Sequence, residues 1–246
     1  MSTIARIGFA DPSPRTVARI TGFLYLATIV TGIFAQGFVA ERLIESGDAA
    51  KTAANILTNP SLYRLGFTVY LIEMTCQMAM TALFYDLLKP VSKPLSRIAA
   101  ILGLAGCVIK TMSRVFFYAP LFALGGAHYL SSFTADQLQS ISLLLLRIND
   151  AGAGMALAFF GFSTLVQGYL MLKATFFPRI LGLLAVVGGV GWLAYLSPPL
   201  GALVFPVAAL VGLVGSLVTI VYLLVKGVNE ERWKAEAVAS SSSIWR

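Results

Sequence analysis

The most apolar stretch of the sequence covers residues 202–225 and reads ALVFPVAALVGLVGSLVTIVYLLV, without a charged side chain. A helix rises about 1.5 Å per residue, so a stretch of this length crosses the hydrocarbon core of a bilayer, which is about 30 Å thick. Five other segments meet the same test of length and composition. The six predicted spans are residues 17–40, 65–88, 97–123, 150–173, 178–197 and 202–226. We therefore expect an all-α integral membrane protein, a bundle of six transmembrane helices.

The overall composition supports this class. Of 246 residues, 58% are hydrophobic and 12% are charged, whereas soluble domains carry about a quarter charged residues. The formal net charge of +7 does not indicate a nucleic-acid partner, because the basic residues lie between apolar segments and not in one patch with exposed aromatic residues. Cys76 and Cys107 lie inside apolar segments and His128 is the single histidine. We therefore expect no disulfide framework, no metal or haem site and no cofactor.

The basic residues also predict an orientation. In a six-span threading, one side of the membrane receives most of the lysines and arginines, namely Arg6, Arg15, Arg19, Lys89, Lys93, Arg97, Lys173, Arg179, Lys226, Arg232 and Lys234. By the positive-inside rule this side is cytoplasmic, so we expect both termini in the cytoplasm. The membrane domain covers residues 16–229. The flanking tails are residues 1–15 and 230–246, and we expect disorder in residues 1–14 and 236–246.

Two long connections on the outer side each predict a short helix lying at the membrane interface. In residues 47–57, Asp48 has the position of an N-cap, and in residues 134–145, Thr134 and Gln137 have capping-box spacing. The order span, surface helix, span thus occurs twice, which indicates either a parallel duplication or two hairpins formed under similar constraints. Small residues four apart, such as Ala185 and Gly189, predict close helix packing within the bundle or in a homo-oligomer.

Three charged residues fall inside predicted spans and are the main indication of function. Lys110 and Arg114 are four residues apart and share a helix face, and Glu73 lies at nearly the depth of Lys110 on an antiparallel neighbour. Because a charge in the bilayer is costly, we expect Glu73 to pair with Lys110. Asp150 is the expected second acidic partner, since one carboxylate cannot neutralise two cations. Neutral partners and an interfacial aromatic residue complete the candidate ligand-binding set, which is Glu73, Lys110, Arg114, Asp150, Gln77, Asn149 and Tyr118.

Simpler structural explanations exist for each of these residues. Arg114 can extend to the outer headgroups, Asp150 can cap the fourth span, and Glu73 with Lys110 can be a buried pair that fixes helix register. A proton or ion path is a further alternative. An enzyme is disfavoured, because the hydroxyls of Thr111, Ser113 and Ser163 have no histidine at a spacing that would activate them.

Several phrases form a recognisable set along the chain. They are Gly47-Asp-Ala-Ala-Lys-Thr-Ala-Ala-Asn-Ile-Leu57, Tyr63-Arg-Leu-Gly66, Leu87-Leu-Lys-Pro-Val-Ser-Lys93, Tyr129-Leu-Ser-Ser-Phe133, Phe159-Phe-Gly161, Gly168-Tyr-Leu170, Phe177-Pro-Arg-Ile-Leu-Gly182 and Lys226-Gly-Val228. With them, residues 16–229 resemble a bacterial membrane family known as domain of unknown function 4386. The resemblance implies a multi-span bacterial membrane protein, which we expect in the inner membrane, and it supplies no activity. Many members have histidine-aspartate at the position of Asn149-Asp150 and a second histidine near Ser163, and this chain lacks both histidines.

These observations lead to one main functional hypothesis and two alternatives. We expect an outward-facing charged cleft between the second, third and fourth spans that binds a small polar or anionic amphiphile, such as a lipid headgroup. The first alternative is a small transporter acting as a dimer. The second is an accessory subunit of a larger membrane complex. Membrane lipids are expected partners in every case.

Overall fold

The computed structural model describes residues 12–242, and in this part of the chain six helices are long and apolar enough to cross a membrane. The predicted all-α multi-pass architecture is therefore confirmed. The predicted disorder of residues 1–11 and 243–246 lies outside the described residues. The elements are α1 (Pro14–Ile33), η1 (Phe34–Ala40), α2 (Glu41–Leu43), α3 (Ala49–Thr58), α4 (Pro60–Leu88), α5 (Lys93–Tyr118), α6 (Pro120–Ala123), η2 (His128–Leu130), α7 (Ala135–Lys173), α8 (Arg179–Leu193), η3 (Ala194–Leu196), α9 (Pro198–Val225) and α10 (Glu230–Ser242).

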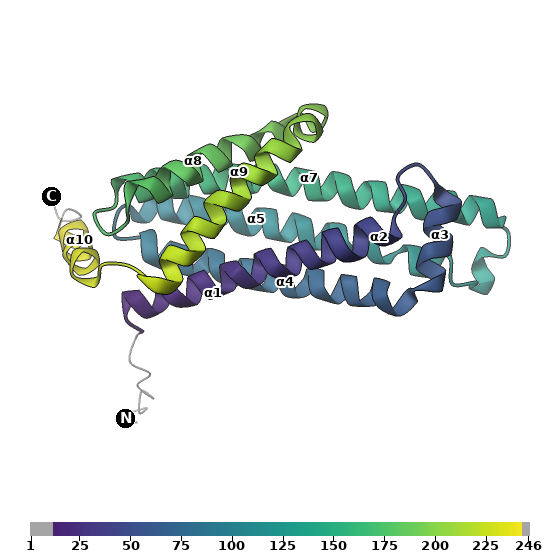
Figure 1. Ribbon diagram of the computed structural model, residues 1–246, viewed down its shortest axis with the longest axis horizontal. Helices are drawn as coiled ribbons and strands as arrows, with labels where there is room; N and C mark the ends of the chain where they lie inside the picture. The colour runs from purple at the N-terminus through teal and green to yellow at the C-terminus, as the bar shows by residue number, and fades with distance from the viewer. Residues whose placement is uncertain (1–11, 243–246) are drawn as a thin grey trace, which may run out of the picture.

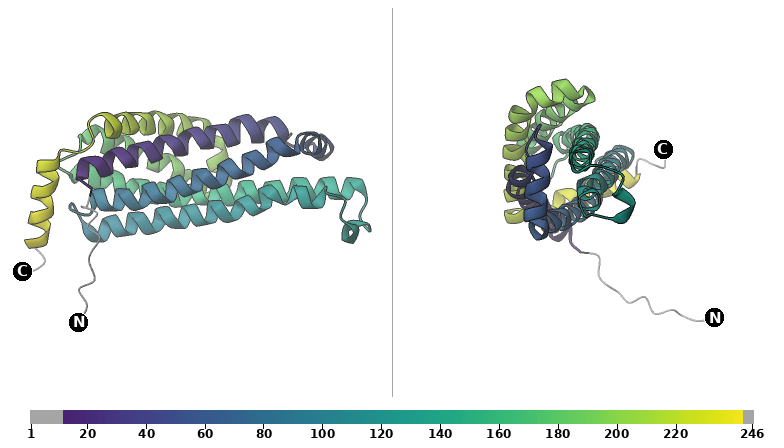
Figure 2. Two further views of the ribbon diagram at one scale, coloured as in Figure 1. Left: turned by 90° about the horizontal axis from the view of Figure 1, so that it is seen from below. Right: turned by 90° about the vertical axis from the view of Figure 1, so that its right-hand side faces the viewer.

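Helices α1, α4, α5 and α7 run side by side, and α8 and α9 form a tilted hairpin against them (Figure 1). The most extensive contacts join α7 to α5 on one side and to α8 on the other. Helix α9 crosses α1 near the end of the bundle where α10 lies, here called the α10 end. The opposite end, where α3 lies, is called the α3 end. Figure 2 shows α10 lying across the α10 end of the bundle.

Two separate hydrophobic cores stabilise the bundle. One occupies the α10 end and includes the fully buried side chains of Leu87, Leu170 and Leu223. The other occupies the α3 end and includes Tyr63 and Phe117, whose rings stack at 4.6 Å. Several of the buried polar residues, among them Thr28, Glu73 and Ser163, belong to the middle parts of the spans.

One of the two predicted short helices is confirmed as a helix, and its place at the membrane interface stays a prediction. Helix α3 begins after Asp48, whose carboxylate accepts a 2.8 Å hydrogen bond from the backbone N–H of Lys51. The prediction of a second, separate interfacial helix over residues 134–145 is wrong. The predicted capping box at Thr134 is present, but the helix that it starts continues without interruption through the fourth span to Lys173, over 39 residues. No proline or glycine separates the two predicted parts, so α7 reaches about 58 Å and extends well past a core about 30 Å thick.

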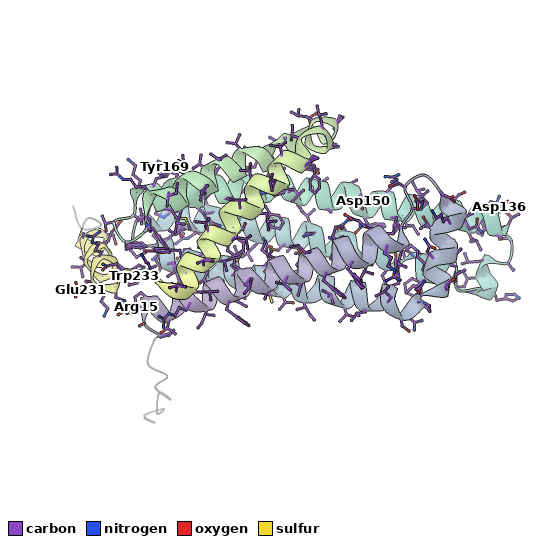
Figure 3. All side chains as sticks on the ribbon, viewed as in Figure 1. Arg15, Asp136, Asp150, Tyr169, Glu231 and Trp233 are labelled. Atoms are coloured by element: carbon purple, nitrogen blue, oxygen red, sulfur yellow. The ribbon has the colours of Figure 1, made fainter. Side chains whose placement is uncertain are left out.

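The predicted disorder of the C-terminal tail is wrong for residues 236–242, which belong to α10. Distant groups hold this helix in place. The indole Nε1 of Trp233 donates to the carbonyl of Leu87 at 2.9 Å, and Glu236 accepts from the hydroxyl of Thr175 at 2.7 Å. The hydroxyl of Ser13 donates to Glu230, and this bond lowers the pKa of that carboxyl from its usual value. Figure 3 shows Trp233 and Glu231 beside Arg15 at this end and Asp136 at the other.

Glycines allow α7 and α8 to approach backbone to backbone. A Cβ added at Gly182 would lie 2.7 Å from the backbone nitrogen of Leu172, and one added at Gly189 would lie 3.0 Å from the carbonyl oxygen of Gly161. Association of helices in lipid depends on such close packing, because water does not drive it. Gly182 and Gly189 are seven residues apart, two turns of one face.

We expect Gly182→Ala to lower the free energy of unfolding by about 1–3 kcal/mol, because the added methyl meets backbone that cannot move aside. The matched control is Gly37→Ala in η1, where an added Cβ meets nothing within 4 Å. Equilibrium unfolding in mixed detergent micelles measures both. An equal loss in the two variants would contradict the role given to the α7–α8 contact.

Candidate functional site

An ion pair between Glu73 of α4 and Lys110 of α5 lies inside the bundle. Lys110 Nζ donates to Glu73 Oε1 at 2.6 Å, and the two side chains are 17% and 6% exposed. The predicted pairing is therefore confirmed. Gly32 of α1 makes room for the carboxylate, because a Cβ there would lie 3.1 Å from Glu73 Oε1.

The second oxygen of this carboxylate is unused. Glu73 Oε2 is buried and has no hydrogen-bond partner among the described residues. A buried acceptor without a partner costs about 1–3 kcal/mol, and more when it is charged. This oxygen thus lacks the donor that a buried carboxylate oxygen normally has.

The ion pair lines a cavity of about 330 Å³ between the two hydrophobic cores, bordered by all six spans. Its polar lining includes Tyr25, Glu73, Gln77, Lys110, Ser163 and Gln167. Aromatic side chains of Phe84, Phe160 and Trp192 form parts of its wall. A cavity of this size and mixed lining is in the range of small-molecule sites, which are about 300–1,000 Å³.

The cavity hydroxyls are mostly committed to backbone carbonyls. Thr28, Thr81 and Thr219 each donate to the carbonyl four residues earlier in their own helix. Ser163 donates to the carbonyl of Ala99 at 2.7 Å and accepts from Gln167 at 3.0 Å. These hydroxyl oxygens keep lone pairs but have no hydrogen left to offer.

Arg114 belongs to a second cluster, nearer the α3 end. It is 3% exposed, its guanidinium lies 3.6 Å from the ring centroid of Tyr70, and its Nη1 donates to Asn149 Oδ1 at 3.0 Å. The hydroxyl of Tyr70 in turn donates to Gln36 at 2.7 Å. An aromatic face and a neutral amide thus replace the expected carboxylate, a combination that stabilises a cation.

Asp150 is not the partner of Arg114, and that prediction is wrong. No salt bridge of Arg114 is found within residues 12–242, and exposed Asp150 instead accepts a 3.1 Å hydrogen bond from Asn149. The reason is helical geometry. Successive residues of a helix point about 100° apart, so Asn149 faces the bundle while Asp150 turns toward its edge.

A π-helical segment shapes the neighbourhood of this cluster. In η1, which continues α1, the chain makes a wider turn that carries Gln36 to Tyr70 and buries Val39 against α4. Gly66 accommodates Val39, because a Cβ there would lie 2.6 Å from Val39 Cγ1. Such segments occur frequently at functional sites.

The seven predicted site residues therefore do not form one cleft. Glu73, Gln77 and Lys110 line the cavity, whereas Arg114 and Asn149 form the second cluster with Asp150 at its edge. Tyr118 packs its ring against Phe67 at 4.6 Å.

Sequence reasoning did not identify several of the residues that complete these sites. Tyr70 precedes Glu73 by three positions on one helix face, a spacing that was a usable signal. Tyr25, Ser163 and Gln167 line the cavity because of where α1 and α7 pack, and the sequence alone does not show this packing.

No group of three or more histidine, cysteine, aspartate or glutamate residues that could hold a metal ion occurs within residues 12–242. Both cysteines are free. The described site offers a ligand hydrogen-bonding groups, an ion pair and aromatic surface.

Residues 20–227 match a family model described as domain of unknown function (DUF4386). Since the match covers most of the chain, the chain belongs to this family. Comparison with the curated proteins and with the solved structures gives no match.

Breaking the ion pair on one side leaves a buried charge uncompensated. We expect Lys110→Met to lower the free energy of unfolding by about 3–5 kcal/mol. The double variant Lys110→Met with Glu73→Gln removes both charges and is expected to regain most of that loss. Equilibrium unfolding in mixed micelles compares the two. A double variant that is less stable than the single one would show that the pair does not act as a unit.

The second cluster predicts unequal effects at two neighbouring positions. Asn149→Leu is expected to cost about 1–3 kcal/mol, because it removes the acceptor of a buried guanidinium. Asp150→Asn keeps the oxygen that Asn149 contacts and is expected to change stability by less than about 0.5 kcal/mol. The same unfolding assay measures both variants. The reverse order would restore Asp150 as the partner of Arg114.

Proposed function

We propose that this DUF4386 member binds a small polar or anionic amphiphile of the membrane in the cavity between its six spans. The observation that carries the proposal is the ion pair of Glu73 with Lys110, which is buried in an apolar bundle and lines a cavity, while the second carboxylate oxygen of Glu73 has no hydrogen-bond partner among the described residues. Polar and ionisable groups inside a membrane are expensive, and they usually mark a pathway or a binding site. A bundle that needed stability alone would be better served by apolar side chains here.

The proposed site differs from the cleft expected from sequence. It is centred on Glu73, Gln77 and Lys110, and it draws in residues of the α8–α9 hairpin such as Trp192 and Ser216. Arg114 contributes to the fold of the α3 end and is assigned no contact with the ligand.

We also propose that the protein lies in the bacterial inner membrane with its α10 end in the cytoplasm. The support is the distribution of basic residues: Arg15, Lys93 and Arg179 begin helices at the α10 end, and Lys173 ends one there.

A small dimeric transporter is the second candidate. It is favoured by the depth of the cavity, because Gly32 follows Arg19 by thirteen residues, or about 20 Å, in a core about 30 Å thick. Substrate sites of transporters lie at a similar depth. Flux of a retained ligand across proteoliposomes distinguishes transport from binding alone.

Native mass spectrometry of the gently extracted protein tests the proposal. The blocking variant is Ala185→Phe, which places a large ring in the cavity lining of α8, and the control is Val187→Phe, two residues on, where the side chain is 48% exposed. We expect an adduct on the wild type and the control that is absent from the blocked variant. A bare wild-type protein, or an adduct that survives Ala185→Phe, would refute the proposal.

A further inference from the structure

The charge of the cavity lining sums to zero. Glu73 and Lys110 are the acidic and basic residues that line it, and they neutralise each other at 2.6 Å. The excess positive charge expected from Arg114 is elsewhere, over the ring of Tyr70. An anionic headgroup would therefore approach Glu73 Oε2 with like charge, and a cationic one would compete with Lys110 for a single carboxylate.

The hydrogen-bonding groups of the cavity require a ligand that both donates and accepts. Glu73 Oε2 is an acceptor without a donor, and the committed hydroxyls of Thr28 and Thr81 also offer only lone pairs. Lys110 has two further N–H hydrogens, and the Gln77 amide has no side-chain hydrogen bond to any residue of the described part, so donors are present too. A hydroxyl group satisfies both kinds, whereas a phosphate or a carboxylate only accepts and an ammonium only donates.

The cavity also has an apolar side that suits a hydrocarbon chain. Ile29, Met80 and Leu157 line it together with the aromatic walls. Ile33 of α1 lines it while being 58% exposed, so the cavity reaches the surface beside this helix. In Figure 1, α1 and α9 cross near the α10 end and separate toward the α3 end.

The place of this opening determines what surrounds it. The contact between α1 and α9 includes the 2.6 Å hydrogen bond between the hydroxyls of Tyr25 and Ser216. Gly32 of α1 and Gly212 of α9, one or two turns closer to the α3 end, line the cavity. Gly32 lies about 20 Å along the helix from Arg19, which is within the hydrocarbon layer. The cavity therefore opens onto lipid chains, and a volume of about 330 Å³ holds a small headgroup while the chain extends outward.

We propose that the ligand is an uncharged, hydroxyl-bearing amphiphile of the acylglycerol type, with its hydroxyls at Lys110 and Gln77 beside the carboxylate of Glu73 and its chain leaving the cavity beside Ile33. This inference rests on the proposed function and narrows it to one class of headgroup.

In the test, the full-length protein in phosphatidylcholine nanodiscs is offered three probes with hydrocarbon chains of equal length. They are monooleoylglycerol, oleoyl lysophosphatidic acid and oleylamine. Native mass spectrometry records which probe is retained. We expect monooleoylglycerol to exceed each charged probe about 10-fold, and to be lost in Ala185→Phe but kept in Val187→Phe. Gln77→Leu should weaken its retention about 2- to 10-fold, as expected for the loss of one neutral hydrogen bond.

A charge variant adds a change of selectivity that a purely structural role would not produce. Glu73→Gln leaves Lys110 without its counter-charge, so preference is expected to shift toward oleoyl lysophosphatidic acid. Its thermal unfolding is measured in parallel, and Gln77→Leu serves as the test if this variant does not fold.

The outcomes separate this inference from the proposed function. Cavity-dependent retention of lysophosphatidic acid or oleylamine in preference to monooleoylglycerol would overturn the inference and leave the proposed site standing. Retention of none of the three probes, or retention that Ala185→Phe does not affect, would overturn both.

Discussion

The ion pair between Glu73 and Lys110 is the constraint on which the centre of the bundle depends. Two charges 37 residues apart in sequence meet at 2.6 Å, away from water. Each would be costly in lipid alone, so α4 and α5 are held in one register and both turn their charged faces inward. Gly32 brings α1 close enough to cover the carboxylate. The two hydrophobic cores lie on either side of this polar centre and leave the cavity between them.

Much of the architecture follows from local properties of the sequence. Long apolar runs identify the six spans, and counting residues from the membrane boundaries brings Glu73 and Lys110 to one depth. Such counting gives depth but no direction around the helix axis. Asn149 and Asp150 are at nearly equal depth, and only their difference in direction decides that the amide reaches Arg114. The π-helical turn in η1 also changes the direction in which the following side chains point, and no residue pattern in the sequence predicts this turn.

Longer-range contacts account for the remaining differences. The tail that forms α10 has the composition of a disordered segment, and its order comes from Leu87 and Thr175, which are distant in sequence. Whether α7 breaks near residue 145 depends on support for its exposed part. That support comes from α3, which packs against it. The cavity was not predictable for the same reason: part of its lining comes from α8 and α9, which pack as a tilted hairpin against the other spans (Figure 1).

Helix α10 also determines where the bundle can deform. It forms hydrogen bonds with Ser13 before α1, with Leu87 at the end of α4 and with Thr175 between α7 and α8. One short helix thus connects three separate parts of the chain at one end of the bundle. Close to it, Gly22 packs against Leu223 and fixes the crossing of α1 and α9. These contacts therefore hold the helices together at the α10 end. A small angular displacement of the α8–α9 hairpin about this end becomes a larger change in width beside Ile33.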